Sequence, residues 1–130
     1  MEKTFARPLS RGSLELTAAF IGRDLLLALS GGDAPHVGAA ALAFPAEGEA
    51  GGGTGCRSLA APGHRDDIPA RELAERLSRA TGARVLCACG IHFDGAAPQL
   101  IAEILEASRG LGDEAAAWAK ENAPRQNEEP

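Results

Sequence analysis

Several residue types are scarce in this chain of 130 residues. It has no tyrosine, one tryptophan and four phenylalanines, whereas glycine occurs 16 times. Small side chains bury little apolar area each, so we expect a modestly stable fold that dimerisation would stabilise. The length is that of one domain with a single core.

Cysteines, basic clusters and long apolar runs are also few. Cys56, Cys87 and Cys89 are odd in number, and the last two share one apolar run, which favours buried, reduced thiols over a disulfide framework. A net charge of −5 with scattered arginines argues against nucleic-acid binding. The N-terminus lacks the apolar core of a signal peptide, and no run approaches the roughly 20 residues that span a bilayer. We therefore expect a cytoplasmic protein that binds neither nucleic acid nor membrane.

Apolar runs separated by glycine turns predict the strands. Residues 13–21 alternate apolar and polar side chains, and a tight break at Gly22 joins them to an apolar run, which predicts an antiparallel hairpin. The run that follows the turn at Gly31 favours the third strand of a meander. The expected strands are residues 13–21, 24–30, 37–44, 56–60 and 84–90.

Capping residues predict the helices. Asp66 or Asp67 can cap a helix that Gly82 ends. A second helix is expected over residues 98–109, and Gly110 and Gly112 are expected to interrupt it before a final helix capped by Asp113. The predicted organisation is an N-terminal extension over residues 1–12, a single domain over residues 13–121 with a flexible glycine-rich loop at residues 45–55, and a disordered tail over residues 122–130.

The order of elements predicts the fold class. Strands run together before helices do, which is typical of an α+β fold. We expect a mostly antiparallel β-sheet formed by a meander of three or four strands, followed by helix-strand-helix, with the helices packed on the sheet.

All three histidines lie in short turns rich in glycine and aspartate. His36, His64 and His92 belong to the stretches GGDAPHVG, PGHRDD and GIHFDG. Histidine titrates near neutral pH and is a common metal ligand, and glycine lets backbone N–H groups approach a ligand. The pattern favours one binding site, although a hairpin loop, a helix cap and a surface turn would each explain one of the three stretches.

Each turn offers different chemistry. Gly31 and Gly32 expose backbone N–H groups, while His64 and Arg65 precede a helix whose unpaired N–H groups can hold a phosphate or carboxylate, unless an aspartate caps them. Asp94 can orient the imidazole two residues before it. No phosphate-binding loop or nucleophile motif is present, so no catalytic residue is predicted.

These stretches also resemble a known family. The strings GGDAPHVGAAALA and LAAPGHRDDIPARELAERLSRATGARVLCACGIHFDGAAPQLIAEIL are similar to the small D-subunit associated with gallate-type decarboxylases, over about Ser13 to Leu111. That family is described as prenylated-flavin chaperones and is similar to proteasome-assembly-chaperone domains. The chain departs from it in the glycine insertion at Gly48–Gly55 and in Phe93.

The resemblance implies a non-catalytic accessory protein rather than an enzyme. Such a protein would bind prenylated FMN or FMN, deliver it to a UbiD-type decarboxylase, and form a homodimer. Apolar walls for the flavin ring would come from Phe44, Phe93, Leu100 or Trp118. The expected cofactor-binding residues are Gly31, Gly32, Asp33, His36, Gly63, His64, Arg65, His92 and Asp94. The alternatives are an assembly or interaction chaperone without a small ligand, and a metal-dependent enzyme using the histidines.

Overall fold

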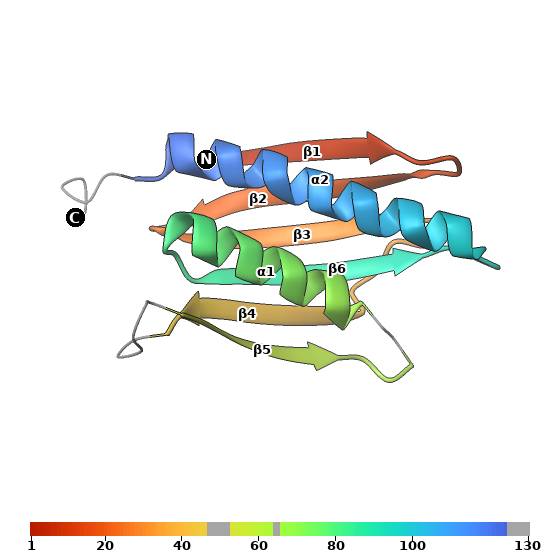
Figure 1. Cartoon of the computed structure of the whole chain (residues 1–130), viewed down its shortest axis with the longest axis horizontal. Helices are drawn as coiled ribbons and strands as arrows, with labels where there is room; N and C mark the ends of the chain where they lie inside the picture. The colour runs from red at the N-terminus through yellow and green to blue at the C-terminus, as the bar shows by residue number, and fades with distance from the viewer. Residues whose placement is uncertain (47–52, 64–65, 125–130) are drawn as a thin grey trace.

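The computed structural model describes residues 1–46, 53–63 and 66–124, which form one six-stranded sheet and two helices. The strands are β1 (Glu2–Pro8), β2 (Ser13–Ile21), β3 (Asp24–Gly32), β4 (Ala39–Pro45), β5 (Thr54–Ala60) and β6 (Val85–His92). The helices are α1 (Asp67–Thr81) and α2 (Pro98–Asn122). Both helices lie side by side across one face of the sheet (Figure 1).

The expected α+β fold is confirmed, and the sheet is mostly antiparallel. Its strand order is β1-β2-β3-β6-β4-β5, and the one parallel pair is β3 with β6. The first three strands form a meander, but the expectation that residues 37–44 continue it is wrong, because β6 lies between β3 and β4. The reason is that β6 carries apolar side chains on both faces, which suits a central position with a neighbour on each side.

The core lies between the sheet and the helices. Alternate residues of β2, β3 and β6 face the helices and are buried, as are the inward residues of α1 such as Leu73 and Leu77. The α1 helix ends at Gly82, whose φ of 75° is left-handed and suits glycine, as expected from the sequence. Cys87 and Cys89 are free thiols within this core.

The α2 helix differs from what the sequence predicts. Residues 98–122 form one continuous helix, so the predicted interruption at Gly110 and Gly112 is wrong. Gly112 is where α2 packs against α1, and a Cβ there would lie 2.8 Å from the Leu73 side chain. A Cβ on Gly110 would meet the guanidinium group of Arg7. Both glycines therefore permit close packing within a helix, despite their poor helix propensity.

The ends of the chain show one further difference. The segment expected as an N-terminal extension contains β1, which pairs with β2 and packs Phe5 against Trp118 with ring centroids 6.4 Å apart. The expected fourth strand is present as β5 and begins at Thr54. Most of the glycine-rich loop (residues 47–52) and the end of the tail (residues 125–130) lie outside the described residues.

Candidate functional site: the histidine cluster

The candidate site lies where the parallel strands β3 and β6 end. Gly31 and Gly32 are paired with Ile91 and His92 at the carboxyl ends of the two strands. The first turns of α1 and α2 lie at the same end of the sheet (Figure 1). A sheet edge where parallel strands end beside helix N-termini gathers backbone donors and side chains from separate segments.

The chain crosses over β6 on its way from β3 to β4. A Cβ on Gly90 would collide with the carbonyl group of His36, which shows that this crossover lies directly on Gly90. The Gly38 N–H donates to the Cys89 carbonyl at 2.8 Å and brings the chain to the far side of β6. Glycine is required at position 90 because the crossover occupies the space of a side chain.

His36 connects the crossover to the start of α1. Its Nε2 lies 3.2 Å from Asp66 Oδ2, and its Nδ1 lies 3.0 Å from the Ala34 carbonyl. The Ile91 N–H donates to the other oxygen of Asp66 at 3.1 Å. Both contacts of the imidazole are to acceptor oxygens, one of the backbone and one of a carboxylate. Asp66 is 8% exposed. Through the hydrogen bonds to His36 and Ile91, its carboxylate connects the start of α1 to the crossover and to β6.

The second part of the site links β6 to the β1–β2 hairpin. His92 Nε2 lies 2.8 Å from Asp94 Oδ1, and the Asp94 N–H donates to Asp33 Oδ2 at 2.9 Å. Arg11 donates to the same Asp33 oxygen at 2.5 Å and to the Asp94 carbonyl at 2.8 Å. Its guanidinium carbon also lies 5.3 Å from the centroid of the Phe93 ring, which is within cation–π range.

These contacts favour the ionised form of Asp33. The Asp94 N–H and then the Arg11 guanidinium lower the pKa of its carboxyl below the usual value. The hairpin and the two loops are therefore held by charge-assisted hydrogen bonds at neutral pH.

The two described histidines converge. The ring centroids of His36 and His92 are 6.5 Å apart and nearly perpendicular. We refer to Arg11, Asp33, His36, Asp66, His92 and Asp94 as the histidine cluster. His64 and Arg65 lie outside the described residues, and Gly63, with φ of 80°, precedes them in the turn before α1. Of the expected site residues, those of the first and third turns are thus brought together.

Two members of the cluster were not expected as site residues. Arg11 reaches it because β1 pairs with β2, and the weak apolar pattern of residues 2–8 does not predict β1. Asp66 was expected only as a helix cap. It occupies the N-cap position, but its side chain makes no capping hydrogen bond and turns to His36 and Ile91 instead.

The residues expected as apolar walls for the flavin ring are divided between the two ends of the sheet. Phe93 is 7% exposed and lies beneath Arg11, while Leu100 is buried in the first turn of α2. Phe44 and Trp118 lie at the opposite end, where β4 finishes and α2 ends. An exposed apolar side chain beside the cluster is Val37, 74% exposed.

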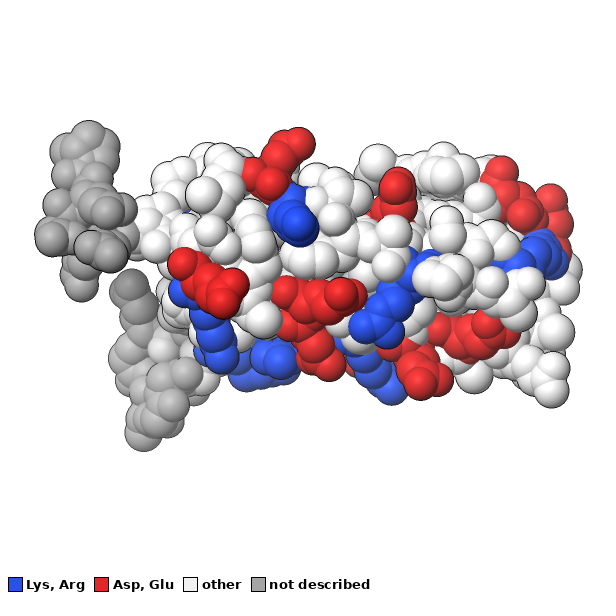
Figure 2. Space-filling view, turned by 90° about the horizontal axis from the view of Figure 1, so that it is seen from above, with Lys and Arg blue, Asp and Glu red and all other residues white. Residues whose placement is uncertain are grey.

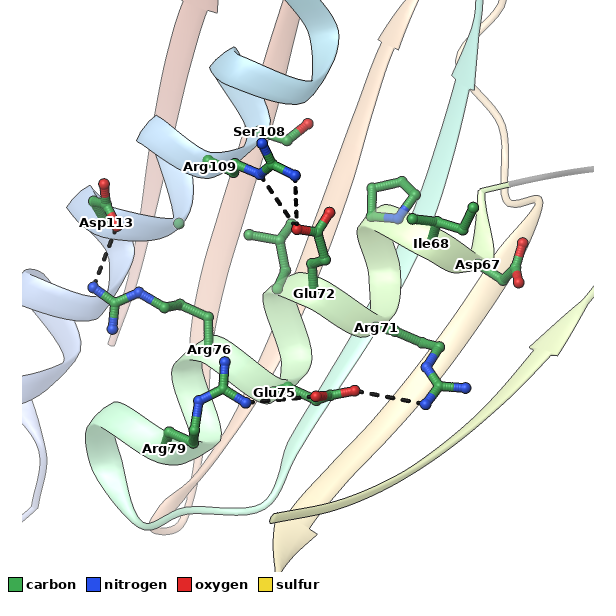
Figure 3. Close-up of a pocket in the computed structure, with 13 residues that line it drawn as sticks. Asp67, Ile68, Arg71, Glu72, Glu75, Arg76, Arg79, Ser108, Arg109 and Asp113 are labelled. Carbon is green, nitrogen blue, oxygen red and sulfur yellow. Dashed lines mark hydrogen bonds and ion pairs between the residues drawn. The ribbon is translucent and has the colours of Figure 1, made fainter. Parts of the chain in front are cut away.

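Away from the histidine cluster, a concave surface with a volume of about 720 Å³ runs between the helices (Figure 3). Ion pairs cross it, with Arg109 3.2 Å from Glu72 and Arg76 3.2 Å from Asp113. No residue of the histidine cluster lines it. Acidic and basic side chains are also interspersed on the side of the molecule shown in Figure 2, without a continuous patch of one sign.

The described residues contain no group of three or more His, Cys, Asp or Glu side chains placed to hold a metal ion. Burial raises the pKa of the Cys87 thiol to about 12 and also raises that of Cys89, so neither is a reactive thiolate at neutral pH. Within the part of the chain that the structure describes, no helix has the length and hydropathy needed to cross a membrane.

Comparisons with known proteins agree with the fold and the sequence motifs. A solved structure titled "Crystal Structure of a Novel Chaperone Complex for Yeast 20S Proteasome Assembly" matches with a TM-score of 0.55 and 16% identity, covering 89% of this chain and 96% of the other. At that identity the likeness shows the fold alone. A search of curated proteins gives no significant match.

Residues 9–120 match the family profile described as the prenylated flavin chaperone LpdD-like domain. The match spans every strand from β2 onward and nearly all of α2. It confirms the resemblance expected from the sequence, and a chaperone family agrees with the expectation of a non-enzymatic protein. The chain belongs to the family of prenylated flavin chaperone LpdD-like domains.

Proposed function

We propose that the histidine cluster binds prenylated FMN, or FMN itself, and that the protein delivers the cofactor to a UbiD-type decarboxylase. The observation that carries the proposal is the convergence of the His36 and His92 turns at the ends of the parallel strands. Family membership supplies the ligand class. The protein then acts by holding and releasing a cofactor.

The cluster offers matching groups for the separate parts of a flavin nucleotide. The carboxylates of Asp33 and Asp94 accept hydrogen bonds from ribityl hydroxyls or ring N–H groups. The phosphate is better placed at the start of α1, because the Asp66 side chain does not cap the helix there. His64 and Arg65 are expected to add positive charge at that point. Val37 provides an exposed apolar contact for the ring.

The openness of the cluster suits delivery. The side chains of His92 and Asp94 are 51% and 83% exposed, so a ligand held there remains accessible to a second protein. An enclosed pocket would instead retain it. Free, buried cysteines are compatible with the expected cytoplasmic location.

Ligand-dependent stabilisation tests this proposal. Reduced prenylated FMN, or FMN, at a hundredfold excess over Kd should stabilise the fold by roughly 2.7 kcal/mol, a rise in Tm on the order of 10 °C for a domain of this size. His92→Asn and Asp94→Asn should each reduce the shift. Asp24→Asn, at the opposite end of β3, serves as the matched control and should leave it unchanged. No shift at saturating ligand would refute cofactor binding.

Transfer to the partner needs a separate measurement. Apo-decarboxylase mixed with the loaded chaperone should gain activity faster than with free prenylated FMN, and His92→Asn should remove the difference. The fold likeness to an assembly-chaperone complex and the groove between α1 and α2 favour a second function, docking of a protein without a small ligand. Complex formation with the decarboxylase that is independent of flavin and of His92 would support that alternative.

A further inference from the structure

The face of the sheet opposite the helices carries an apolar area that the single chain leaves uncovered, apart from the end where the His36 crossover lies on Gly90. Side chains on this face form rows that cross the sheet, because paired residues point to the same side. One row contains Leu26, Leu86 and Leu42, which are 36%, 40% and 42% exposed. The next row contains Ala28, Ala88 and Ala40 in the same three strands.

This pattern indicates a second covering layer. Strands that face solvent on one side alternate apolar and polar residues, whereas strands covered on both sides have continuous apolar runs. The runs LLLALS in β3 and VLCAC in β6 are of the second kind. A contiguous apolar face in a folded protein marks an interaction surface.

The charges at the two ends of the leucine row identify the occupant. The row begins at Glu2 on β1 and ends at Arg57 on β5. Among the described residues, neither side chain has an ion pair. A surface with opposite charges at its two ends is complementary to its own copy after a two-fold rotation that exchanges those ends.

We propose that this face binds a second copy of the chain about a two-fold axis that runs along the strands, between β3 and β6. Arg57 of each copy then meets Glu2 of the other, and the leucine rows face each other. The roughly 30° angle between stacked sheets lets leucines of one copy enter the alanine row of the other. An axis across the strands would instead place β5 on β5 and leave both charges unpaired.

The face is large enough for such an interface. Six strands about 4.8 Å apart and roughly 25 Å long give a projected area on the order of 600 Å² before the relief of the side chains is added. A standard interface buries about 800 Å² of accessible surface on each partner.

The axis also determines where the two histidine clusters lie. It keeps the strand directions, so both clusters come to the same end of the dimer. His92 belongs to β6, and the His36 crossover lies on Gly90 of that strand. Measured in the plane of the sheet, β6 is about half a strand spacing, roughly 2.4 Å, to one side of the axis. The two clusters therefore meet beside the axis and form one composite site. This second step rests on the proposed function of the cluster.

Molar mass in solution tests the interface. The wild-type chain should have twice its monomer mass of 13.3 kDa by light scattering at micromolar concentration, and Leu86→Lys should have the monomer mass with an unchanged circular dichroism spectrum. Ile101→Lys is the matched control, because Ile101 is 49% exposed on the helical side, and it should remain dimeric. A monomeric wild type, or a dimeric Leu86→Lys, would overturn the proposal.

Charge reversal tests the axis without altering the apolar face. Arg57→Glu and Glu2→Arg should each raise the dimer dissociation constant about tenfold, and the double variant should return it near the wild-type value. Failure of the double variant to restore dimers would overturn this axis.

Flavin binding tests the composite site. Monomeric Leu86→Lys should lose at least tenfold in FMN affinity although its histidine cluster is intact. Wild-type affinity in that monomer would overturn the composite site but not the dimer. A wild-type dimer that binds no flavin would refute the proposed function and leave the interface standing.

Discussion

The two faces of the sheet show how one set of strands can serve two purposes. On the covered face, Leu27 and Leu29 of β3 are no more than 1% exposed and pack beneath the helices. On the opposite face, their neighbour Leu26 is 36% exposed. All three residues are leucines, and they differ in which face of the sheet they point to, because successive side chains of a strand point to opposite faces. A strand with apolar residues at both odd and even positions is therefore expected to be covered on both faces, and the helices of a single chain cover one of them.

The first prediction separates the two faces by stability. Leu27→Ala removes a fully buried side chain and should lower the free energy of unfolding by about 2–5 kcal/mol. Leu26→Ala should cost less than about 1 kcal/mol when the chain is dilute and monomeric. Urea unfolding followed by circular dichroism measures both. Equal losses at low concentration would show that the two faces are buried alike within one chain.

The second prediction concerns the His36 crossover, which covers part of the open face at Gly90. Gly90→Ala would place a Cβ in the backbone of the His36 crossover, and we expect a loss of about 1–3 kcal/mol. The amide signals of residues 33–38 should move in NMR spectra. Ser30→Ala changes the residue paired with Gly90 without adding an atom, so it is the control. A crossover that is undisturbed by Gly90→Ala would contradict the geometry described above.

The third and smallest effect is the dependence of the folding stability on acid pH through the contact between Asp33 and Arg11 of the β1–β2 hairpin. The Asp94 N–H and Arg11 lower the pKa of Asp33 in the folded state, so the folded protein holds this proton less tightly than the unfolded chain does. The resulting stability is complete above the unfolded pKa of about 3.9 and is lost as the pH falls through the lower folded value.

Asp33→Asn should therefore reduce the loss of stability between pH 5 and pH 2 relative to wild type. Urea unfolding across that range provides the measurement. The Ser10 hydroxyl and N–H lower the pKa of Glu103. Glu103→Gln should therefore also reduce the loss of stability between pH 5 and pH 2 relative to wild type. If both variants lost as much stability between pH 5 and pH 2 as wild type does, the contacts described for Asp33 and Glu103 would be contradicted.

The sequence predicts most elements but only part of their arrangement. Alternation in residues 13–21 and the turn at Gly22 are local signals, and they correctly predict the β2–β3 hairpin. The position of β6 between β3 and β4 depends on pairs of residues that are 60 positions apart for β3 and 42 to 50 positions apart for β4, which no local pattern records. The poor helix propensity of glycine predicts an interruption at Gly110, whereas in the structure the missing side chain leaves space for the guanidinium group of Arg7.

The candidate site shows the same division. Turn composition identified Asp33, His36, His92 and Asp94, and these residues do converge. Arg11 could not be found because its approach depends on β1, whose apolar pattern is weak. Asp66 was assigned to the helix behind it, and only the tertiary arrangement brings it 3.2 Å from His36.

The position of β6 also has a consequence for the order of folding. Strands β1 to β3 can pair as soon as they are synthesised, and β4 can pair with β5 across a short connection. Within the sheet that the structure describes, β6 is the strand that joins the two groups, and it is made after α1. Until then, β3 and β4 each expose an unpaired apolar edge, the kind of edge that invites aggregation. A protein of a chaperone family is thus itself vulnerable during its own synthesis, until one late strand closes its sheet.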